Sequence, residues 1–468
     1  MNHFPGICVS LLTCALALTS AVAQKKSKPL AKAPKTQPKA MPERASTDNN
    51  PRVNFTEHKL KNGLRVFLVE DHSAPVVSIA VNYNVGSRNE RKGRTGFAHL
   101  FEHMMFQGSQ NIGKSEHFIL VQNNGGTMNG TTNTDRTIYF ESLPANQLDL
   151  ILFLEADRMK SLDISKENLD NQRNAVQEER RLGVDNQPYG KGFERFETEV
   201  YDNFAYKHSV IGSMADLNAA SVDDVSGFFK MYYAPNNAVL ALVGDFDSKV
   251  ALEKIKAQYE GIASQPTPPS VDVTEPEQKA ERRFTEEDAL AQIPALLIGY
   301  KGNFFNTPDE EALQVLDSVL TGGRSSRLYQ KLVKDKQLVV QIQGGADTDH
   351  RGPSMFGFQA FVSPGKKTEE VEAAIYEEIA KLQIEPIADW ELEKAKNSFR
   401  TNFIRGKQSS MGLAMAVAES AISYGSPKVI NEALSKMQAV TKDDVQRVAK
   451  KYFSANNRTV FLITPAKK

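Results

Sequence analysis

Cysteine is nearly absent from this chain of 468 residues. The only two, Cys8 and Cys14, lie within the first 23 residues. If that segment is removed, the remaining chain has neither a thiol nor a disulfide, and its stability rests on a hydrophobic core. Histidine is also scarce, with 8 residues, so a pattern that brings two of them together is informative.

No long apolar run marks a membrane span near the amino terminus. The run from Ile7 to Leu18 is shorter than the roughly 18 residues that a spanning helix needs. It is followed by Ala21-Val22-Ala23, which has the small-x-small pattern of a signal-peptidase site. We interpret residues 1–23 as a secretory signal peptide, although the segment lacks the Lys or Arg that usually begins one.

The chain also lacks a net charge, and its charges are unevenly distributed. Residues 24–50 hold seven Lys and Arg against two acidic residues, with several prolines and little to bury, so we expect a disordered basic linker. Because the whole chain sums to zero and residues 1–23 carry no charged side chain, residues 51–468 have a net charge of −5. This composition does not favour nucleic-acid binding.

An internal repeat divides the remaining chain. Residues 221–237 resemble residues 441–457 without a gap, at a constant offset of 220 positions. Each copy predicts a capped helix, an Asn-Asn turn and an apolar strand. The Pro-rich stretch after the first copy predicts a linker. We therefore expect one domain at 51–264, a linker at 265–280 and a second domain at 281–468.

The pattern of apolar residues predicts the fold class. Strands are expected at 64–69, 76–81 and 238–243 in the first unit and at 294–300 and 459–463 in the second, and helices at 148–159 and 368–382. Strands grouped with flanking helices, without a Gly-rich phosphate loop, predict an α+β fold. We expect two similar sandwich-like units, each a mainly antiparallel sheet flanked by helices.

The stretch 97–105 carries the most specific chemical pattern in the chain. On a helix, His99, Glu102 and His103 leave one face within about one turn. Two imidazoles at this spacing supply two zinc ligands, and the carboxylate between them can act as general base towards a zinc-activated water. The order His-x-x-Glu-His is the inverzincin signature. Its apolar neighbours predict a largely buried helix.

A third ligand should be a carboxylate on another element. Glu178 and Glu179 are both candidates, and since helix neighbours point about 100° apart, only one can reach the metal.

The second unit should lack these ligands. At the offset of 220, the motif corresponds to Val319, Gly322 and Gly323. The second unit should therefore form a wall or lid.

Residues 96–104, 124–132 and 322–328 together make the chain resemble the pitrilysin or insulinase-type (M16) zinc peptidases. The resemblance extends from about residue 55 to the end and is closest to short two-domain members related to mitochondrial processing peptidase. It implies two clam-like halves around a closed chamber, with one Zn²⁺ per chain on the inner wall of the first. It selects Glu179 as the third ligand and leaves Glu178 as the alternative.

The resemblance also implies how substrate binds. Members of the family add the substrate as a strand to a sheet edge, a mode that recognises backbone more than side chains. Residues 125–139 resemble that edge, with Gly126, Asn129 and Thr131 as expected substrate-binding residues and Asn129 as the contact to a substrate carbonyl. Gly130 stands where the family usually has Ala. A Gly-rich turn before an ordinary strand is the alternative.

The chain departs from the family in its second unit. Relatives carry an Arg and, seven positions later, a Tyr that hold substrate from the opposite wall, whereas Val333 and Val340 stand here. We therefore expect a heterodimer with a second family member that lacks the zinc motif and carries this Arg/Tyr pair. The alternatives are a homodimer, or substitution by a nearby lysine at 331, 334 or 336.

The expected function is that of a secreted zinc metalloendopeptidase for peptides and unfolded segments. The signal peptide together with the resemblance places it in a bacterial periplasm. The alternatives are a non-catalytic scaffold subunit of a processing-peptidase-like complex and a zinc hydrolase with another substrate.

Overall fold

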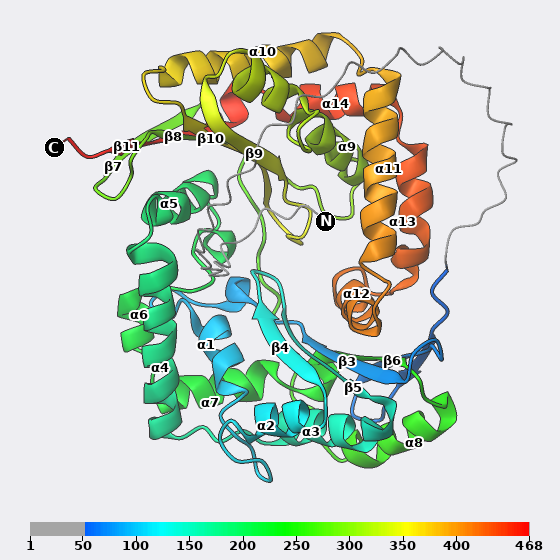
Figure 1. Ribbon diagram of the computed structural model, residues 1–468. Coiled ribbons are helices and arrows are strands. Elements are labelled where there is room, and N and C mark those ends of the chain that lie inside the picture. Colours follow the sequence, from blue (N-terminus) through cyan, green and yellow to red (C-terminus); the bar gives the residue numbers. More distant parts are fainter. Residues whose placement is uncertain (1–51, 468) are drawn as a thin grey trace, which may run out of the picture.

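The computed structural model describes residues 52–467. The expected signal peptide at 1–23 and basic linker at 24–50 lie outside the described residues. The described residues form two mixed sheets, one in each half of the molecule, and helices flank each sheet (Figure 1). No helix in this part of the chain is long and apolar enough to cross a membrane.

The first unit contains β1 Thr56–Lys59, β2 Arg65–Glu70, β3 Val76–Tyr83, α1 Phe97–Met104, α2 Glu116–Asn123, β4 Thr127–Thr132, β5 Thr137–Pro144, α3 Leu148–Lys160, α4 Lys166–Arg180, α5 Gly190–Val200, α6 Met214–Asn218, α7 Val222–Tyr232, β6 Ala238–Gly244 and α8 Ser248–Tyr259. The second contains β7 Arg282–Asp288, β8 Ala295–Gly302, α9 Glu310–Leu320, β9 Val339–Ala346, β10 Ser354–Val362, α10 Thr368–Ile384, α11 Asp389–Arg405, α12 Ser410–Ser423, α13 Lys428–Ala439, α14 Lys442–Tyr452 and β11 Arg458–Pro465. Short helical turns join several of them. The expected strands and helices are all present, within a few residues of their predicted ends.

Apart from β1, which adds to one edge of the first sheet, the two sheets repeat one topology. The first has the strand order β1-β2-β6-β3-β5-β4 and the second β7-β11-β8-β10-β9. In each, one pair is parallel, β2 with β6 and β7 with β11, and the other pairs are antiparallel. The offset of 220 residues also relates the helices, for example from Gly190 at the start of α5 to Ser410 at the start of α12. The prediction of an α+β fold with two similar units is confirmed.

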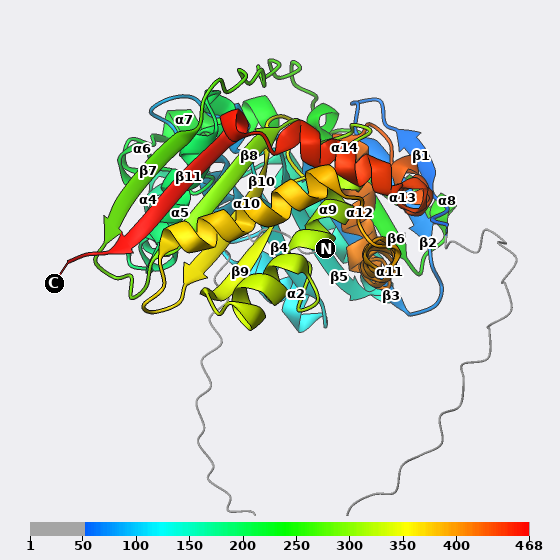
Figure 2. The ribbon, with the colours of Figure 1, turned by 90° about the horizontal axis from the view of Figure 1, so that it is seen from above.

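Each sheet is covered on both faces. Strands β3 and β6 are buried almost throughout, because apolar residues occupy both of their faces. On one face the first sheet packs against helices of its own unit, including α1, α3, α7 and α8. Seen from above, α10 and α14 lie across the second sheet in the same way (Figure 2).

The opposite faces are covered by an exchange of helices between the units. Helix α12 of the second unit packs on β3, β5 and β6 of the first sheet, where Val417 and Ala418 lie in one core with Ala241. Helix α5 of the first unit packs in turn on β8 and β11, where Phe196 lies in one core with Phe461. The two units therefore form one interlocked body, although the sequence repeat separates them.

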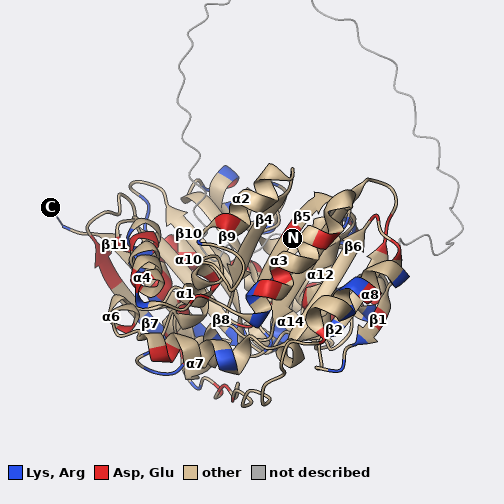
Figure 3. Cartoon of the chain, turned by 90° about the horizontal axis from the view of Figure 1, so that it is seen from below, with Lys and Arg blue, Asp and Glu red and all other residues tan. Residues whose placement is uncertain are grey.

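The segment expected as a linker has no helix or strand between 263 and 279. It is nonetheless fixed, because the Glu275 carboxylate accepts hydrogen bonds from the backbone of Asp202 and Asn203 and pairs with Lys301. Seen from below, Lys and Arg are interspersed with Asp and Glu over α3, α7 and α8 (Figure 3). Each of these three helices therefore carries charged residues of both signs.

Candidate metal centre

Helix α1 presents the His-x-x-Glu-His motif from a buried position. The helix begins at Gly96, whose φ of +83° suits glycine, and a Cβ there would lie 2.5 Å from the carbonyl oxygen of Ile211. Phe97, Leu100, Phe101 and Met104 turn into the first core. The other face is left to the motif, and it lies between α4 and β4 (Figure 1).

The structure brings His99, His103 and Glu179 together. The Oε2 of Glu179 lies 3.7 Å from the Nε2 of His99 and 3.4 Å from the Nε2 of His103, and the three ligand atoms lie within 4.8 Å of one another. Zinc with tetrahedral bonds of about 2.0–2.2 Å spaces its ligand atoms roughly 3.3–3.6 Å apart. The donor set and its spacing therefore fit a zinc ion with one position left open.

Glu178, the alternative third ligand, points elsewhere. Its Oε2 pairs with the Nη1 of Arg181 at 3.0 Å, and its side chain is 58% exposed. This is the behaviour of a solvated helix face. Of the two adjacent carboxylates, Glu179 is the one that converges on the histidines.

The pKa values of the two histidines shift in opposite directions. Burial, together with the neighbouring His103, lowers the pKa of His99 to about 4. Burial also acts to lower the pKa of His103, but the hydrogen-bonded Glu179 carboxylate reverses the shift and raises it. His103 in turn lowers the pKa of Glu179. Because metal ligands must be deprotonated, a cation at this site would compete with the proton that the pairing of His103 and Glu179 favours.

Glu102 does not belong to the ligand cluster. Burial raises the pKa of its carboxyl, and a hydrogen bond from the Thr132 side chain on β4 opposes this shift. Gly130 lies against it as well, since a Cβ at that position would stand 3.2 Å from the Cγ of Glu102 and 3.1 Å from Tyr139. Glu102 is thus held beside both the ligands and the strand β4.

Strand β4 is an edge strand of the first sheet. Gly130 and Thr132 face Glu102, so by the alternation of side chains Asn129 and Thr131 face the other side of the sheet. The Oδ1 of Asn129 accepts from the backbone N–H of Gly130 at 2.9 Å. Gly126 lies where a Cβ would come within 2.6 Å of the carbonyl oxygen of Ser142. The segment is a sheet edge, and its backbone is more available than its side chains.

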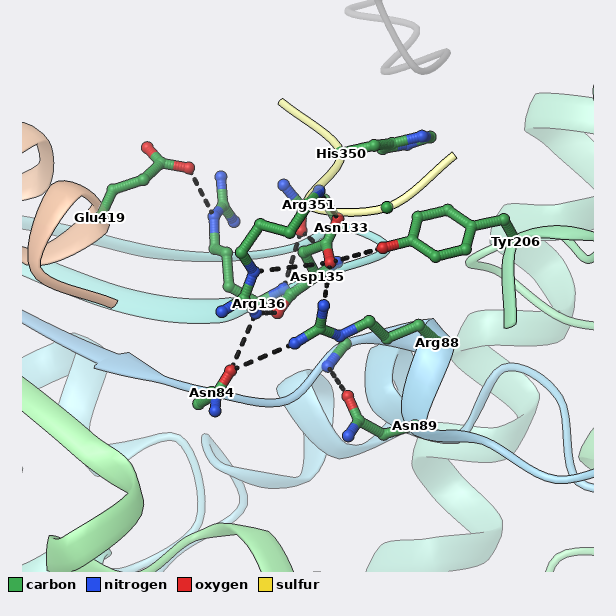
Figure 4. A network of polar contacts seen from close by, with 12 residues as sticks. Asn84, Arg88, Asn89, Asn133, Asp135, Arg136, Tyr206, His350, Arg351 and Glu419 are labelled. Carbon is green, nitrogen blue, oxygen red and sulfur yellow. Dashed lines mark hydrogen bonds and ion pairs between the residues drawn. The ribbon is translucent and has the colours of Figure 1, made fainter. Parts of the chain in front are cut away.

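A cavity of about 1970 Å³ extends from the metal cluster to the second unit. His99, Glu179 and Thr132 line it on one side, and residues of α9, α11, α12 and α13 line it on the other. Residues 133–136, directly after β4, join the two walls (Figure 4). Asp135 pairs with Arg88 at 2.6 Å and accepts from the backbone N–H of Arg351 at 3.0 Å, and Arg136 pairs with Glu419 of α12 at 3.2 Å.

In the second unit, a lysine lies against the segment that corresponds to the metal motif. Val319, the counterpart of His99, is buried in the second core. The ammonium of Lys394 donates to the carbonyl oxygens of Gly322 at 2.7 Å and Ser318 at 3.4 Å, at the carboxyl end of α9. The segment that corresponds to the motif thus carries no metal-binding side chain, and Lys394 binds its backbone carbonyl groups.

The positions that depart from the family stay outside the cavity. Val333 packs against the second core, and Val340 is exposed on the edge strand β9. Lys331 pairs with Glu377 at 2.6 Å and Glu378 at 2.9 Å. The lining drawn from the described residues includes none of the three lysines near these positions. Substitution of the missing donors by Lys331, Lys334 or Lys336 has no support here.

One other cluster of potential ligands occurs among the described residues. His117, Glu141 and Glu155 lie together, fully buried. The guanidinium of Arg158 already compensates them, because its Nε lies 2.8 Å from Glu155 and its Nη2 lies 3.8 Å from Glu141. This cluster is a buried ion network.

Several residues around the centre have no sequence signal. Gln172 hydrogen-bonds His103, Thr132 hydrogen-bonds Glu102, Glu90 accepts hydrogen bonds at the start of α1, and His208 pairs with Glu90. None has a spacing pattern, since each reaches the motif only through the folded chain. The periodic motif could be found in the sequence because it lies on one helix.

Two histidines one helical turn apart, with a glutamate converging from a second helix, are the donor set of a zinc hydrolase. Two family models match the chain: "Insulinase (Peptidase family M16)" over residues 65–213 and "Peptidase M16 inactive domain" over residues 219–399. Zinc protease PqqE of Helicobacter pylori is 31% identical over 409 residues, covering 87% of this chain and 92% of that protein. The chain belongs to the insulinase (M16) peptidase family.

Further similarities agree with this assignment. The probable mitochondrial-processing peptidase subunit beta of Arabidopsis thaliana is 23% identical over 419 residues, covering 87% of this chain and 77% of that protein. The crystal structure of a protease from Helicobacter pylori matches with a TM-score of 0.84 at 30% identity, covering 88% and 100%. A peptidase M16 inactive domain from Pseudomonas fluorescens matches with a TM-score of 0.79 at 15% identity, covering 89% and 99%, and supports the fold alone.

Proposed function

We propose that the chain is a zinc metalloendopeptidase that hydrolyses peptides and unfolded segments. The observation that carries this proposal is the convergence of His99, His103 and Glu179 at ligand spacing, with Glu102 beside them and the edge strand β4 alongside. Zinc in such a set serves as a Lewis acid that acidifies water and polarises a carbonyl.

The roles of the protein groups follow from their positions. An extended peptide adds to the free edge of β4 through backbone hydrogen bonds, in the segment that contains Gly126, Asn129 and Thr131. Glu102 accepts a proton from the attacking water as the new C–O bond forms. The same carboxyl then gives the proton to the departing amine when the C–N bond breaks. Glu102 is positioned for this work because it lies between the ligands and the substrate edge.

A decisive experiment measures zinc and peptidase activity in the same preparation. The purified chain is expected to hold one zinc per molecule and, alone or with a co-expressed relative, to cleave a flexible peptide in a chelator-sensitive reaction that added zinc restores. A protein that binds no zinc, or that binds it without cleavage in both preparations, would contradict the proposal.

A non-catalytic scaffold role is the second candidate. It is favoured by the description of the matching C-terminal family model as an inactive domain. In this chain that description concerns the second unit, where Val319, Gly322 and Gly323 stand at the positions that correspond to the motif. The proposal of catalysis rests on the first unit, and zinc bound without hydrolysis would favour the scaffold.

For the active assembly we propose a heterodimer with a family member that lacks the zinc motif and carries the Arg/Tyr pair. It is supported by Val333 and Val340, whose side chains cannot donate hydrogen bonds, and by Lys331, whose ammonium is already paired with Glu377 and Glu378. Loss of donors aimed at a reacting carbonyl commonly costs on the order of 10²- to 10³-fold in rate. Peptidase activity and size are measured with and without a co-expressed relative. Full activity of the lone chain, unchanged by the partner, would contradict this assembly.

We further propose export through the segment 1–23, with a bacterial periplasm as the destination. This rests on the apolar run and the Ala21-Val22-Ala23 site in the sequence. Fractionation of cells and the amino-terminal sequence of the mature protein test it, with Gln24 expected as the first residue. An uncleaved protein that stays in the cytoplasm would overturn it.

A further inference from the structure

The start of α1 is held by a buried carboxylate from outside the motif. The Oε1 of Glu90 accepts from the backbone N–H of Ala98 at 2.7 Å, and its Oε2 accepts from the N–H of Gly96 at 2.9 Å. The side chain of Glu90 is entirely buried. A negative charge at this point binds the unpaired N–H groups of the helix and complements its dipole.

Among residues 52–467, the carboxylate of Glu90 has one side-chain partner, His208. The Nε2 of His208 lies 3.0 Å from the Oε2 of Glu90 and 3.0 Å from the carbonyl oxygen of Ser87, and its Nδ1 lies 2.8 Å from the carbonyl oxygen of Phe204. Both ring nitrogens therefore face oxygen acceptors, which requires a hydrogen on each. The ring stacks on Phe204 at 4.6 Å, and Lys92 lies over the far ring of that stack at 5.8 Å.

The segment that carries His208 also contacts the second metal-bearing helix. Gly212 packs against Gly96 so closely that a Cβ on it would come within 2.4 Å of the Gly96 backbone. The carbonyl oxygen of Gly212 accepts from the Nη1 of Arg180 at 2.7 Å, and Arg180 directly follows Glu179 on α4. Asp216 binds the backbone N–H of Thr95 at 3.0 Å. Residues 208–216 thus connect the beginning of α1 to the end of α4.

We propose that Glu90 and His208 are positioning residues that set α1 against α4 and so hold His99 and His103 at coordinating distance from Glu179. This inference rests on the proposed function, since it assigns these residues to the zinc site. Neither residue reaches the ligand cluster: Glu90 binds the backbone at the start of α1, and His208 acts on the helix through Glu90. Because helix and segment are packed without space at Gly96 and Gly212, a shift at Glu90 moves the histidines as a unit.

The test compares Glu90→Gln and His208→Gln with the wild type. In Glu90→Gln the amide keeps the shape but turns a donor towards one of the N–H groups that the carboxylate accepted. Substitution of residues that orient ligands commonly lowers metal affinity by about 10- to 100-fold, and we expect the zinc dissociation constants of both variants to rise to that extent. The value is measured by competition with a chelator, and cobalt substitution reports the ligand geometry through its absorption spectrum.

Kinetics separate positioning from folding. Both variants should lose kcat with KM nearly unchanged, since the substrate edge β4 is not touched. Asp224→Asn is the control: its carboxylate binds Arg91 and Arg94 of the same loop but does not contact α1. It should keep zinc affinity and the cobalt spectrum. The double variant should bind zinc no more weakly than Glu90→Gln alone, because His208 acts on α1 only through Glu90.

The outcomes are distinguishable. If the wild type binds zinc and cleaves peptide while both variants match it in zinc affinity, cobalt spectrum and kcat, the inference is wrong and the proposed function stands. If the wild type binds no zinc, the proposed function fails first. If Glu90→Gln does not fold, His208→Gln decides alone, because its side chain lines the cavity and its loss leaves the helix contacts of Glu90 in place.

Discussion

Glu178 and Glu179, adjacent on α4, face different partners. The Oε2 of Glu179 lies 3.4 Å from the Nε2 of His103, whereas the Oε2 of Glu178 pairs with Arg181 at 3.0 Å. One residue of sequence therefore separates a candidate metal ligand from a solvated carboxylate.

The first prediction uses this pair as variant and matched control. Glu179→Gln removes the anionic ligand and should lose zinc and activity together, as should substitution of His99 or His103. Glu178→Gln changes the neighbouring carboxylate in the same way and should keep both. Zinc content by elemental analysis and turnover of a peptide measure the two outcomes. Zinc retained by Glu179→Gln would show that Glu179 is not the third ligand. Zinc lost by Glu178→Gln would give that role to Glu178.

The second prediction concerns Glu102. Glu102→Gln should keep zinc, because the residue lies outside the ligand cluster, and should lower kcat by about 10²- to 10⁴-fold, because the amide cannot accept the proton of the attacking water. Near-normal turnover in this variant would show that Glu102 is not the base. A simultaneous loss of zinc would instead place the residue among the ligands.

The metal motif could be predicted from the sequence because its geometry is local. Helix periodicity alone places His99, Glu102 and His103 on one face. Glu179 lies on another helix, so the sequence pattern did not distinguish it from Glu178 as the third ligand. Only the family resemblance favoured Glu179. Glu90 and His208 are separated by 118 positions and meet only in the folded chain, which leaves no spacing to read.

The fold could be predicted in outline for a similar reason. The repeat at 220 residues and the apolar strands indicate two like units. Periodicity shows that a helix such as α5 or α12 has a face to bury, but it does not show which sheet receives that face. The exchange that places α12 on the first sheet and α5 on the second is a tertiary result.

The third prediction concerns His350, which lies between β9 and β10. It is a pH dependence of the free energy of unfolding. His350 pairs with Asp347, the Nδ1 lying 3.0 Å from the Oδ2. Burial acts to lower the pKa of His350, but the Asp347 carboxylate raises it to about 9 from 6.5. A raised pKa in the folded state stabilises the protein fully below 6.5, and this contribution is lost as the pH rises towards 9.

The size of this effect is at most roughly 3 kcal/mol, from about 1.4 kcal/mol per pKa unit. Urea unfolding of the wild type and His350→Gln from pH 6 to pH 9.5 measures it. The variant should be less stable at pH 6, and the difference should shrink as the pH rises. A constant difference across this range would show that the pair does not titrate as described.

The fourth prediction is a limit on substrate size. The cavity beside the ligands has a volume of about 1970 Å³ and is bounded by both units, which are interlocked through α5 and α12. An extended peptide fits at the edge of β4, but a folded domain cannot enter, and its backbone is already paired. The chain should therefore cleave a flexible peptide and spare the same sequence within a compact domain. A matched pair tests this: one small stable protein, and a destabilised variant of it that is unfolded under the assay conditions. Cleavage should follow the unfolded fraction, and equal rates on both forms would show that substrate reaches the metal centre by another route.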